Sequence, residues 1–173
     1  MFGRDLVEQV QADSKDGPRK VPVIVEKCIE AVESLGRATL CWRKAVLTEA
    51  NTALDYEGIY RKTGGSGQSK AITQLFERGD YLAFDLHDTD RFNDICSVTS
   101  VLKTYFRSLP VPLFTFDLHD GFMKAVEIKD PAQKHKAMVD LLDKLPDEHY
   151  YTLCVLMIHL SRWVPAFPPA ELV

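Results

Sequence analysis

The segment Y-E-G-I-Y-R-K-T-G-G-S-G-Q, residues 56–68, places a permanently charged arginine beside a loop with few side chains. Arg61 follows a short apolar run, and Gly58 lies ahead of it. Three more glycines follow the arginine: Gly64, Gly65 and Gly67. Glycine adopts φ > 0 without steric cost, so this loop can project Arg61 outward and let another macromolecule approach closely. Two kinds of chemistry fit the pattern: a loop that cradles a phosphate, or an arginine offered to a partner.

Phosphate binding by the loop itself is disfavoured by its sequence. The Walker A pattern requires G-x-x-x-x-G-K-[ST], whereas here Lys70 follows Ser69, and Ala71 stands where a magnesium-binding hydroxyl would be needed. The five histidines include no i, i+4 pair and no H-E-x-x-H, and no serine lies in a G-x-S-x-G turn. We therefore expect no cofactor, no metal site and no catalytic activity of the chain's own.

Two further basic residues share one side of a predicted helix. Lys103 and Arg107 are spaced i, i+4, so they lie on the same helix face, beside an apolar stripe. Taken alone, such a pair is more often a solvated helix flank than a binding site. A lone Arg61 is likewise more often a surface residue or an ion-pair partner, and only its glycine-rich context favours a functional interpretation.

The composition is that of one soluble globular domain. The chain has 173 residues, 46% hydrophobic and 27% charged, with a net charge of −4, which gives no reason to expect nonspecific binding to nucleic acid or membranes. Four acidic residues within positions 1–20 argue against a signal peptide, and the longest apolar run, 153–158, is too short to span a bilayer. The cysteines lack C-x-x-C or metal-ligand spacing, so we expect reduced, mostly buried thiols in a cytosolic protein. They are Cys28, Cys41, Cys96 and Cys154.

Apolar residues recur with a helical period along most of the chain, and no segment alternates as a strand does. The predicted fold class is therefore all-α, a bundle of six or more helices. Asp88 or Asp90 is expected to cap the helix 90–109, and Pro110 to stop it. The last helix is apolar nearly all round, which predicts a central position in the core. The expected helices span 22–34, 68–78, 90–109, 115–126, 130–142 and 147–162.

Several of these pieces, in this order, resemble the Rho GTPase-activating (RhoGAP) domain family. Y-E-G-I-Y-R-K-T-G-G, residues 56–65, is similar to the family's arginine-loop motif, G-[IL]-[FY]-R-x-[SP]-G. V-L-K-T-Y-F-R-S-L-P-V-P-L-F, residues 101–114, is similar to its L-K-x-[FY]-[FL]-R-x-L-P-x-P-L signature. Phe2-Gly3, residues 21–33 and residues 145–160 are also similar to segments of the family. The two motifs together are far more specific than G-I-Y-R alone.

The resemblance implies a role for each matching residue. Arg61 would be an arginine finger, inserted into the active site of a GTP-bound Rho-family GTPase to neutralise charge on the transferring phosphoryl group. Lys103 and Arg107 would support the arginine loop and the GTPase-facing surface, with Gly58, Gly64 and Gly65 shaping the loop. Pro110 and Pro112 would shape the turn after the helix. The chain would then be a GTPase activator rather than an enzyme, cytoplasmic, and recruited to membranes through its GTPase.

Two departures from the family pattern stand out. Residues 34–53 do not resemble the family and are interpreted as an atypical insertion, either a surface loop or non-native sequence such as translated intron. The family's N-x-M-x-x-x-N-L-type stretch, with an asparagine that faces the GTPase, and its last helices have no counterpart. The resemblance implies a domain over 1–162, incomplete at its C-terminus, followed by a proline-rich tail, 163–173.

These departures leave two alternatives to GTPase activation. One is a GTPase-binding or interaction module that does not accelerate hydrolysis. The other is a non-functional fragment, since the missing helices would leave apolar faces uncovered, including that of the helix 147–162. The sequence does not identify the target GTPase.

Overall fold

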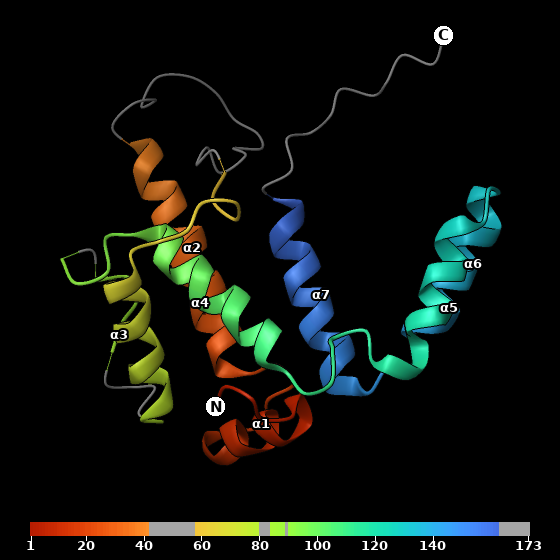
Figure 1. Cartoon of the computed structure of the whole chain (residues 1–173), viewed down its shortest axis with the longest axis horizontal. Helices are drawn as coiled ribbons and strands as arrows, with labels where there is room; N and C mark the ends of the chain where they lie inside the picture. The colour runs from red at the N-terminus through yellow and green to blue at the C-terminus, as the bar shows by residue number, and fades with distance from the viewer. Residues whose placement is uncertain (42–57, 80–83, 89, 163–173) are drawn as a thin grey trace, which may run out of the picture. The chain divides into compact units, whose positions relative to one another are not determined.

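The computed structural model describes residues 1–41, 58–79, 84–88 and 90–162, with backbone alone at residue 16 and over 35–41. Within these ranges the chain is helical, without a strand, as the sequence predicts. Figure 1 shows the elements along the chain. They are α1 (Leu6–Asp13), the 3-10 helix η1 (Ser14–Asp16), α2 (Val23–Cys41), α3 (Ser66–Glu77), α4 (Ile95–Ser108), α5 (Phe116–Glu127), α6 (Pro131–Leu142) and α7 (Asp147–Ser161).

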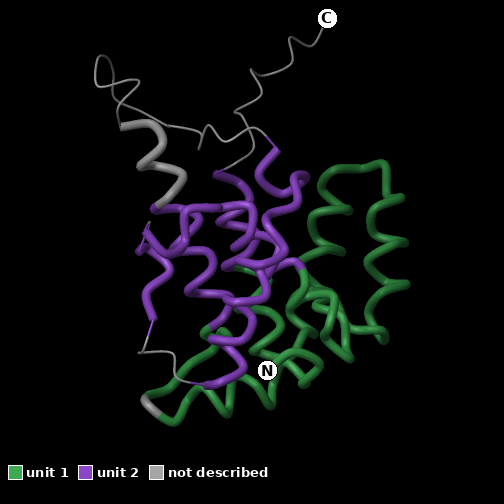
Figure 2. The backbone as a smooth tube through the Cα atoms, turned by 60° about the vertical axis from the view of Figure 1, so that its left-hand side comes forward, with its two compact units in different colours: residues 1–23, 104–154 green, residues 24–103, 155–173 purple. Residues whose placement is uncertain are grey.

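The chain divides into two compact units, coloured separately in Figure 2. Unit 1 comprises Met1–Val23 and Thr104–Cys154, and unit 2 comprises Ile24–Lys103 and Val155–Val173. The boundaries fall inside α4, inside α7 and directly after the first residue of α2, so each of these helices contributes one part to each unit.

Unit 1 begins with a short helix that the periodicity analysis does not predict. Asp5 caps α1 by accepting hydrogen bonds from the backbone N–H groups of Val7 (2.9 Å) and Glu8 (3.4 Å). At its other end the buried Asp13 carboxylate accepts from the Val23 N–H (2.8 Å), at the first residue of α2. This side chain satisfies one of the donors that a helix start leaves without a backbone partner.

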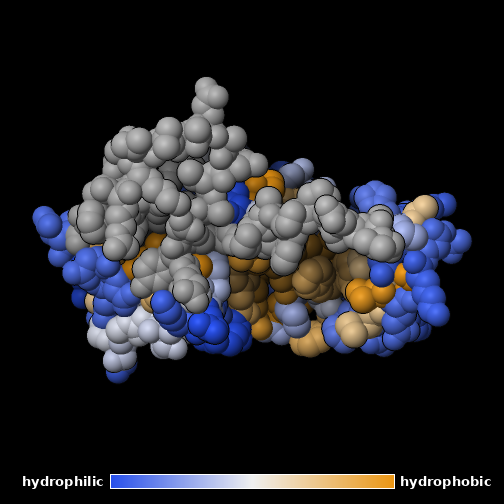
Figure 3. Space-filling model, turned by 90° about the horizontal axis from the view of Figure 1, so that it is seen from above, coloured by the Kyte–Doolittle hydropathy of each residue, from blue (hydrophilic) through white to orange (hydrophobic). Residues whose placement is uncertain are grey.

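An α5–α6 hairpin forms another part of unit 1. Asp130 caps α6 by accepting from the Ala132 N–H (3.2 Å), and Pro131 occupies the first turn, where its missing N–H costs nothing. The two helices approach closely at Gly121, where an added Cβ would lie 2.8 Å from Leu141 Cδ2. Hydrophobic side chains remain exposed on the hairpin, whose surface shows orange patches among blue at the right of Figure 3. They are Phe116, Met123, Val126 and Val139.

The core of unit 2 is built by α2, α3 and the first part of α4. Their inward positions are fully buried and include Ile24, Val32, Ile72 and Val98. Lys27 of α2 reaches the segment after α3, where its ammonium donates to the Phe84 carbonyl (3.1 Å) and lies 5.0 Å from the ring centroid.

Three details of the helix prediction are wrong. The helix expected to end at Ser34 continues to Cys41, because its extension contains no proline and the single Gly36 costs only about 1 kcal/mol. Neither Asp88 nor Asp90 caps α4; Asp94 does so by accepting from the Cys96 N–H (3.0 Å). Finally, α7 is not central along its whole length.

Toward its C-terminal end α7 has an exposed side, since Met157 is 47% and Ile158 is 55% exposed. This agrees with the expectation of an uncovered apolar face. Residues 42–53 of the predicted insertion and the predicted tail, 163–173, lie outside the described residues, so both interpretations remain predictions.

Candidate functional site

Arg61 lies in a tight turn that Gly58 makes possible. The Gly58 carbonyl accepts hydrogen bonds from the N–H groups of Arg61 (2.9 Å) and Lys62 (2.8 Å). Gly58 has φ +73°, a conformation that L side chains rarely adopt. An added Cβ there would make only ordinary contacts, 3.5 Å from Arg61 Nε, so the backbone conformation rather than space requires glycine. The turn leaves the Arg61 side chain exposed.

The backbone before Arg61 is fixed to α4. The Thr99 hydroxyl donates to the carbonyl of Ile59 (3.0 Å), and the Lys103 ammonium donates to the carbonyl of Tyr60 (2.9 Å). The Ile59 side chain is buried in the core of unit 2, 5% exposed. Two successive carbonyls and one apolar side chain thus hold the approach to Arg61.

The backbone after Arg61 is fixed to the start of the same helix. Gly64 donates to the Ser100 hydroxyl (3.2 Å), and Gly65 donates to the Asp94 carboxylate (2.7 Å). An added Cβ on Gly64 would lie 2.1 Å from the Ser97 nitrogen, so the loop and the helix backbone are too close for any other residue. The sequence predicts freedom for φ > 0 at all four glycines of the loop, but among them only Gly58 has such a φ.

Asp94 joins the loop to the helix start. Its carboxylate accepts from the Ser97 hydroxyl (2.6 Å), from Gly65 and from Cys96. Partial burial favours the neutral form, but these hydrogen bonds outweigh that effect and lower the pKa of Asp94. Asp94 is therefore an ionised anchor at neutral pH that serves the cap and the loop together.

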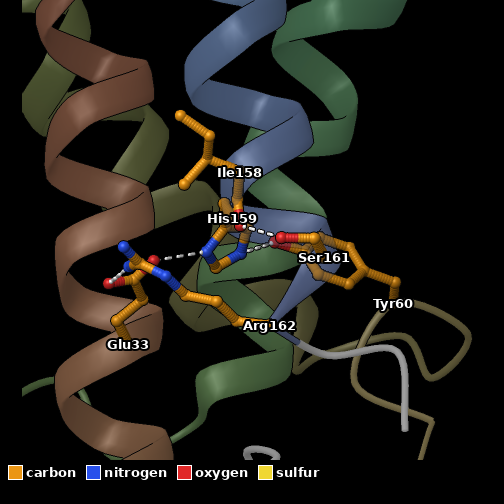
Figure 4. Close-up of polar contacts among 6 residues, drawn as sticks. All are labelled: Glu33, Tyr60, Ile158, His159, Ser161 and Arg162. Atoms are coloured by element: carbon orange, nitrogen blue, oxygen red, sulfur yellow. Dashed lines mark hydrogen bonds and ion pairs between the residues drawn. The ribbon is translucent and has the colours of Figure 1, made fainter. Parts of the chain in front are cut away.

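A second set of contacts reaches Tyr60 from α2 and α7 (Figure 4). The Tyr60 hydroxyl lies 2.5 Å from Nε2 of the buried His159, and His159 Nδ1 lies 3.0 Å from Glu33 Oε1. The Arg162 guanidinium donates to the other Glu33 oxygen, Oε2. The hydroxyl of Ser161 donates to the Ile158 carbonyl (2.8 Å) in the last turn of α7.

The titration properties of this set follow from its burial. Burial lowers the pKa of His159 despite the neighbouring Glu33 carboxylate. Burial opposes ionisation of Glu33, but hydrogen bonds and charges from His159 and Arg162 lower its pKa overall. Burial also raises the pKa of the Tyr60 hydroxyl. At neutral pH the set therefore comprises a neutral tyrosine, a neutral imidazole and a carboxylate.

The structure brings together five of the eight predicted site residues. Arg61, Gly58, Gly64, Gly65 and Lys103 belong to unit 2 and form one local assembly. The other three, Arg107, Pro110 and Pro112, belong to unit 1.

In unit 1, the three remaining predicted residues are exposed. Arg107 donates to the Thr104 hydroxyl (3.1 Å), and the Pro112 carbonyl accepts from the Thr115 N–H (2.8 Å) in a turn before α5. Pro110 follows the end of α4, where it was expected to stop the helix.

Sequence reasoning did not identify the anchors of the loop. Three of those at the start of α4, Asp94, Ser97 and Ser100, recur at i, i+3 spacing, so a search for small polar residues at that spacing would have found them. Those on α2 and α7 are distant in sequence and gave no local signal. The residues missed are Asp94, Ser97, Thr99, Ser100, Tyr60, Glu33 and His159.

Other kinds of site receive no support from the described parts of the chain. No three His, Cys, Asp or Glu side chains gather there as metal ligands, and none of the helices described has the length and apolar character to cross a membrane. Cys28 and Cys96 are buried free thiols, Cys154 is a half-buried one, and burial raises the pKa of Cys28.

Comparison with known proteins decides the family. The sequence model of the RhoGAP domain matches residues 43–164, well over half of the chain. The chain belongs to the RhoGAP domain family. The predicted resemblance to this family is confirmed, and the role of the loop around Arg61 remains a prediction. We refer to residues 58–65 as the arginine loop.

Relatives and solved structures agree with this assignment. The RhoGAP chain is 32% identical to human N-chimaerin over 162 residues, which cover 94% of this chain and 30% of that protein. It is 34% identical to Rho GTPase-activating protein 100F of Drosophila melanogaster over 166 residues, 93% of this chain and 8% of the relative. The crystal structure of human Rho GTPase activating protein 15 superposes with a TM-score of 0.75 at 28% identity, covering 94% of this chain and 66% of that one. The chain therefore spans only about a third of N-chimaerin and a smaller part of the fly protein.

Proposed function

We propose that this chain stimulates GTP hydrolysis by a Rho-family small GTPase in its GTP-bound state, and that Arg61 is the arginine finger it supplies in trans. The observation that carries the proposal is the contrast at residue 61. The backbone on both sides is held by α4, while the guanidinium itself is exposed. Such a loop can enter a partner's active site without first having to become ordered.

The chemistry suits an arginine. During phosphoryl transfer, charge spreads over the oxygens of the transferred group, and a guanidinium can donate to two of them in one plane. A finger supplied in trans accelerates hydrolysis by roughly 10³–10⁵-fold, which corresponds to about 4–7 kcal/mol of the barrier. The catalytic water and the nucleotide belong to the GTPase, so this chain acts as an activator and not as an enzyme with its own active site.

The other predicted residues have supporting roles in this proposal. Lys103 holds the Tyr60 carbonyl, and so fixes the residue that precedes the finger. Arg107 is exposed, and we assign it to the GTPase-facing surface together with the turn at Pro110 and Pro112. The relatives named Rho GTPase-activating proteins support the choice of partner. A cytoplasmic location, with recruitment to membranes through the GTPase, belongs to the same proposal.

Single-turnover GTP hydrolysis by a panel of Rho-family GTPases, with and without the chain, tests this function. The unsubstituted chain should accelerate at least one GTPase, and Arg61→Ala should lower the stimulated rate by roughly 10³–10⁵-fold while preserving most of the binding. Arg61→Lys should recover little of the rate, because an ammonium lacks the planar fork.

Arg78→Ala is the matched control, since Arg78 is an exposed arginine of the same unit that lies past the end of α3. Unchanged stimulation by Arg61→Ala would contradict the arginine-finger mechanism. Binding of the GTP form by the folded, unsubstituted chain without acceleration would instead favour an interaction module.

A further inference from the structure

The residue next to the proposed finger is held at two ends. Lys103 binds the Tyr60 carbonyl from α4, and His159 binds the Tyr60 hydroxyl from α7. His159 is 1% exposed and contacts Glu33 of α2, so three side chains from three separate segments form a continuous series. None of the three matches a position to which the family resemblance assigned a function.

The direction of the hydrogen bonds follows from chemistry. A neutral imidazole has one N–H, and the ionised Glu33 carboxylate can only accept. Nδ1 of His159 therefore carries the proton and donates to Glu33, which leaves Nε2 to accept from the Tyr60 hydroxyl. Tyr60 donates a proton that it does not readily lose, so the series orders the loop and performs no acid–base chemistry.

A buried series of polar side chains destabilises the fold unless every hydrogen-bond donor and acceptor in it has a partner. A buried imidazole without partners would lose its hydrogen bonds to water, and an apolar side chain would fill the same space without that cost. Here both ring nitrogens of His159 have partners, and Arg162 donates a hydrogen bond to the second carboxylate oxygen of Glu33. What the polar series adds over an apolar one is direction, because a hydrogen bond fixes where the Tyr60 ring and its backbone lie.

We propose that Tyr60, His159 and Glu33 are positioning residues that hold the arginine loop in the geometry in which Arg61 enters a GTPase. The proposal rests on the proposed function for its consequence on hydrolysis, whereas its consequence for the loop can be measured without a GTPase. Loss of one neutral hydrogen bond in the series should lower the maximal stimulated rate by roughly 2- to 10-fold. Affinity for the GTPase should change less, because the surface around Arg61 is retained.

The substitutions can separate the two hydrogen bonds of His159. Tyr60→Phe removes only the hydroxyl and keeps the ring. His159→Asn places an amide near the position of Nδ1, which preserves the donor to Glu33 and removes the acceptor for Tyr60. Tyr151→Phe and His135→Asn are the controls, since both side chains are exposed and belong to unit 1. Circular dichroism shows whether each variant is folded. If His159→Asn does not fold, Tyr60→Phe alone tests the proposal.

Two readouts are measured on the full chain. Amide hydrogen exchange of the Arg61 and Lys62 N–H groups, which bond to the Gly58 carbonyl, reports the order of the loop. Single-turnover hydrolysis at several concentrations of the chain separates the maximal rate from the affinity for the GTPase. Faster exchange together with a lower maximal rate, in Tyr60→Phe and His159→Asn but in neither control, would support the proposal.

Two outcomes would overturn the proposal, and a third would leave amide hydrogen exchange as the deciding measurement. Unchanged exchange overturns it, even if the rate falls, because the effect would then bypass the loop. Faster exchange with an unchanged maximal rate also overturns it, because the loop's order would not matter for the reaction. If the unsubstituted chain stimulates no GTPase, the proposed function fails separately, and exchange alone decides whether the series positions the loop.

Discussion

The arginine loop of unit 2 and the α5–α6 hairpin of unit 1 are stabilised by different kinds of interaction. The loop is held by hydrogen bonds from polar side chains to backbone atoms, with Thr99, Ser100 and Asp94 among the donors and acceptors. The hairpin packs through apolar contact at Gly121 and leaves large hydrophobic side chains exposed, with Phe116 67% exposed. No side chain of α6 is buried.

The difference shows which region tolerates little change. Hydrogen bonds to backbone atoms have strict distances and angles, so a small displacement of the loop breaks several at once. Apolar contacts lack direction, and a hairpin that relies on them can adjust its side chains. We therefore expect substitutions at equivalent kinds of position to cost far more in the loop than in the hairpin.

The largest difference in the free energy of unfolding should appear between alanine substitutions at two glycines, one in the loop and one in the hairpin. Gly64→Ala should destabilise the fold by about 3 kcal/mol or more and abolish stimulation, because the new Cβ meets the Ser97 backbone at 2.1 Å. Gly121→Ala should change stability by about 1 kcal/mol at most, because its Cβ meets only the tip of Leu141 and alanine favours a helix. Urea unfolding of the variants measures both free energies.

Gly67→Ala is the control for this pair, since nothing lies within 4 Å of its added Cβ and the residue lies in the first turn of α3. It should be neutral or slightly stabilising. Equal costs for Gly64→Ala and Gly121→Ala would show that the loop can move away from α4, contrary to the comparison.

A smaller difference in stability should appear between asparagine substitutions at two aspartates that cap helices. Asp94→Asn retains an oxygen for the Cys96 N–H but loses an acceptor for Gly65, so we expect a loss of about 1 kcal/mol and weaker stimulation. Asp130→Asn, at the start of α6, should be nearly neutral, because Asp130 accepts only from the Ala132 N–H and asparagine caps equally well.

The pH dependence sharpens this prediction. The folded state lowers the pKa of Asp94 below its ordinary 3.8, so Asp94 contributes stability that is present above that pH and is lost as pH falls through the lower folded value. Thermal unfolding of Asp94→Asn should therefore depend less on pH below about 4 than that of the unsubstituted chain. The same acid dependence in both proteins would refute an ionised anchor.

The smallest effect is expected on the exposed side of the hairpin. Phe116→Glu should alter the free energy of unfolding by no more than about 0.5 kcal/mol, because the side chain is already mostly in water and an acidic residue suits the first turn of α5. Chemical denaturation provides the measurement. A loss above about 2 kcal/mol would mean that this exposed ring is covered by part of the fold.

The sequence predicts most helices well because their apolar residues recur with a strong period. The starts at Pro131 and Asp147 agree with the structure, since local capping and proline chemistry determine them. The short helix Leu6–Asp13 was missed because its eight residues give too few repeats to establish a period. For the last helix the sequence supports two expectations, a central position and an uncovered apolar face. The exposure of Met157 and Ile158 agrees with the second, because apolar composition alone cannot show which side of a helix is covered.

The site was predictable only where a side chain acts at a recognisable motif position. Arg61 and Lys103 were selected from local patterns, whereas Glu33 and His159, which are 126 residues apart, meet only in the folded chain. Gly64 was noticed for its freedom of φ, but its role is close approach to a helix backbone. Such a role depends on the neighbour's position, which no single segment contains.

One property of the loop has a consequence for inheritance. Its anchors on α4 bind backbone atoms of Ile59, Tyr60, Gly64 and Gly65, so the side chain at residue 61 is not among the groups they hold. Under the proposed function, a missense change at Arg61 would leave a folded protein at normal abundance. That protein would still occupy the GTPase and shield it from an intact activator. One altered allele would then act dominantly, whereas a change at Gly64 would lower abundance and act recessively.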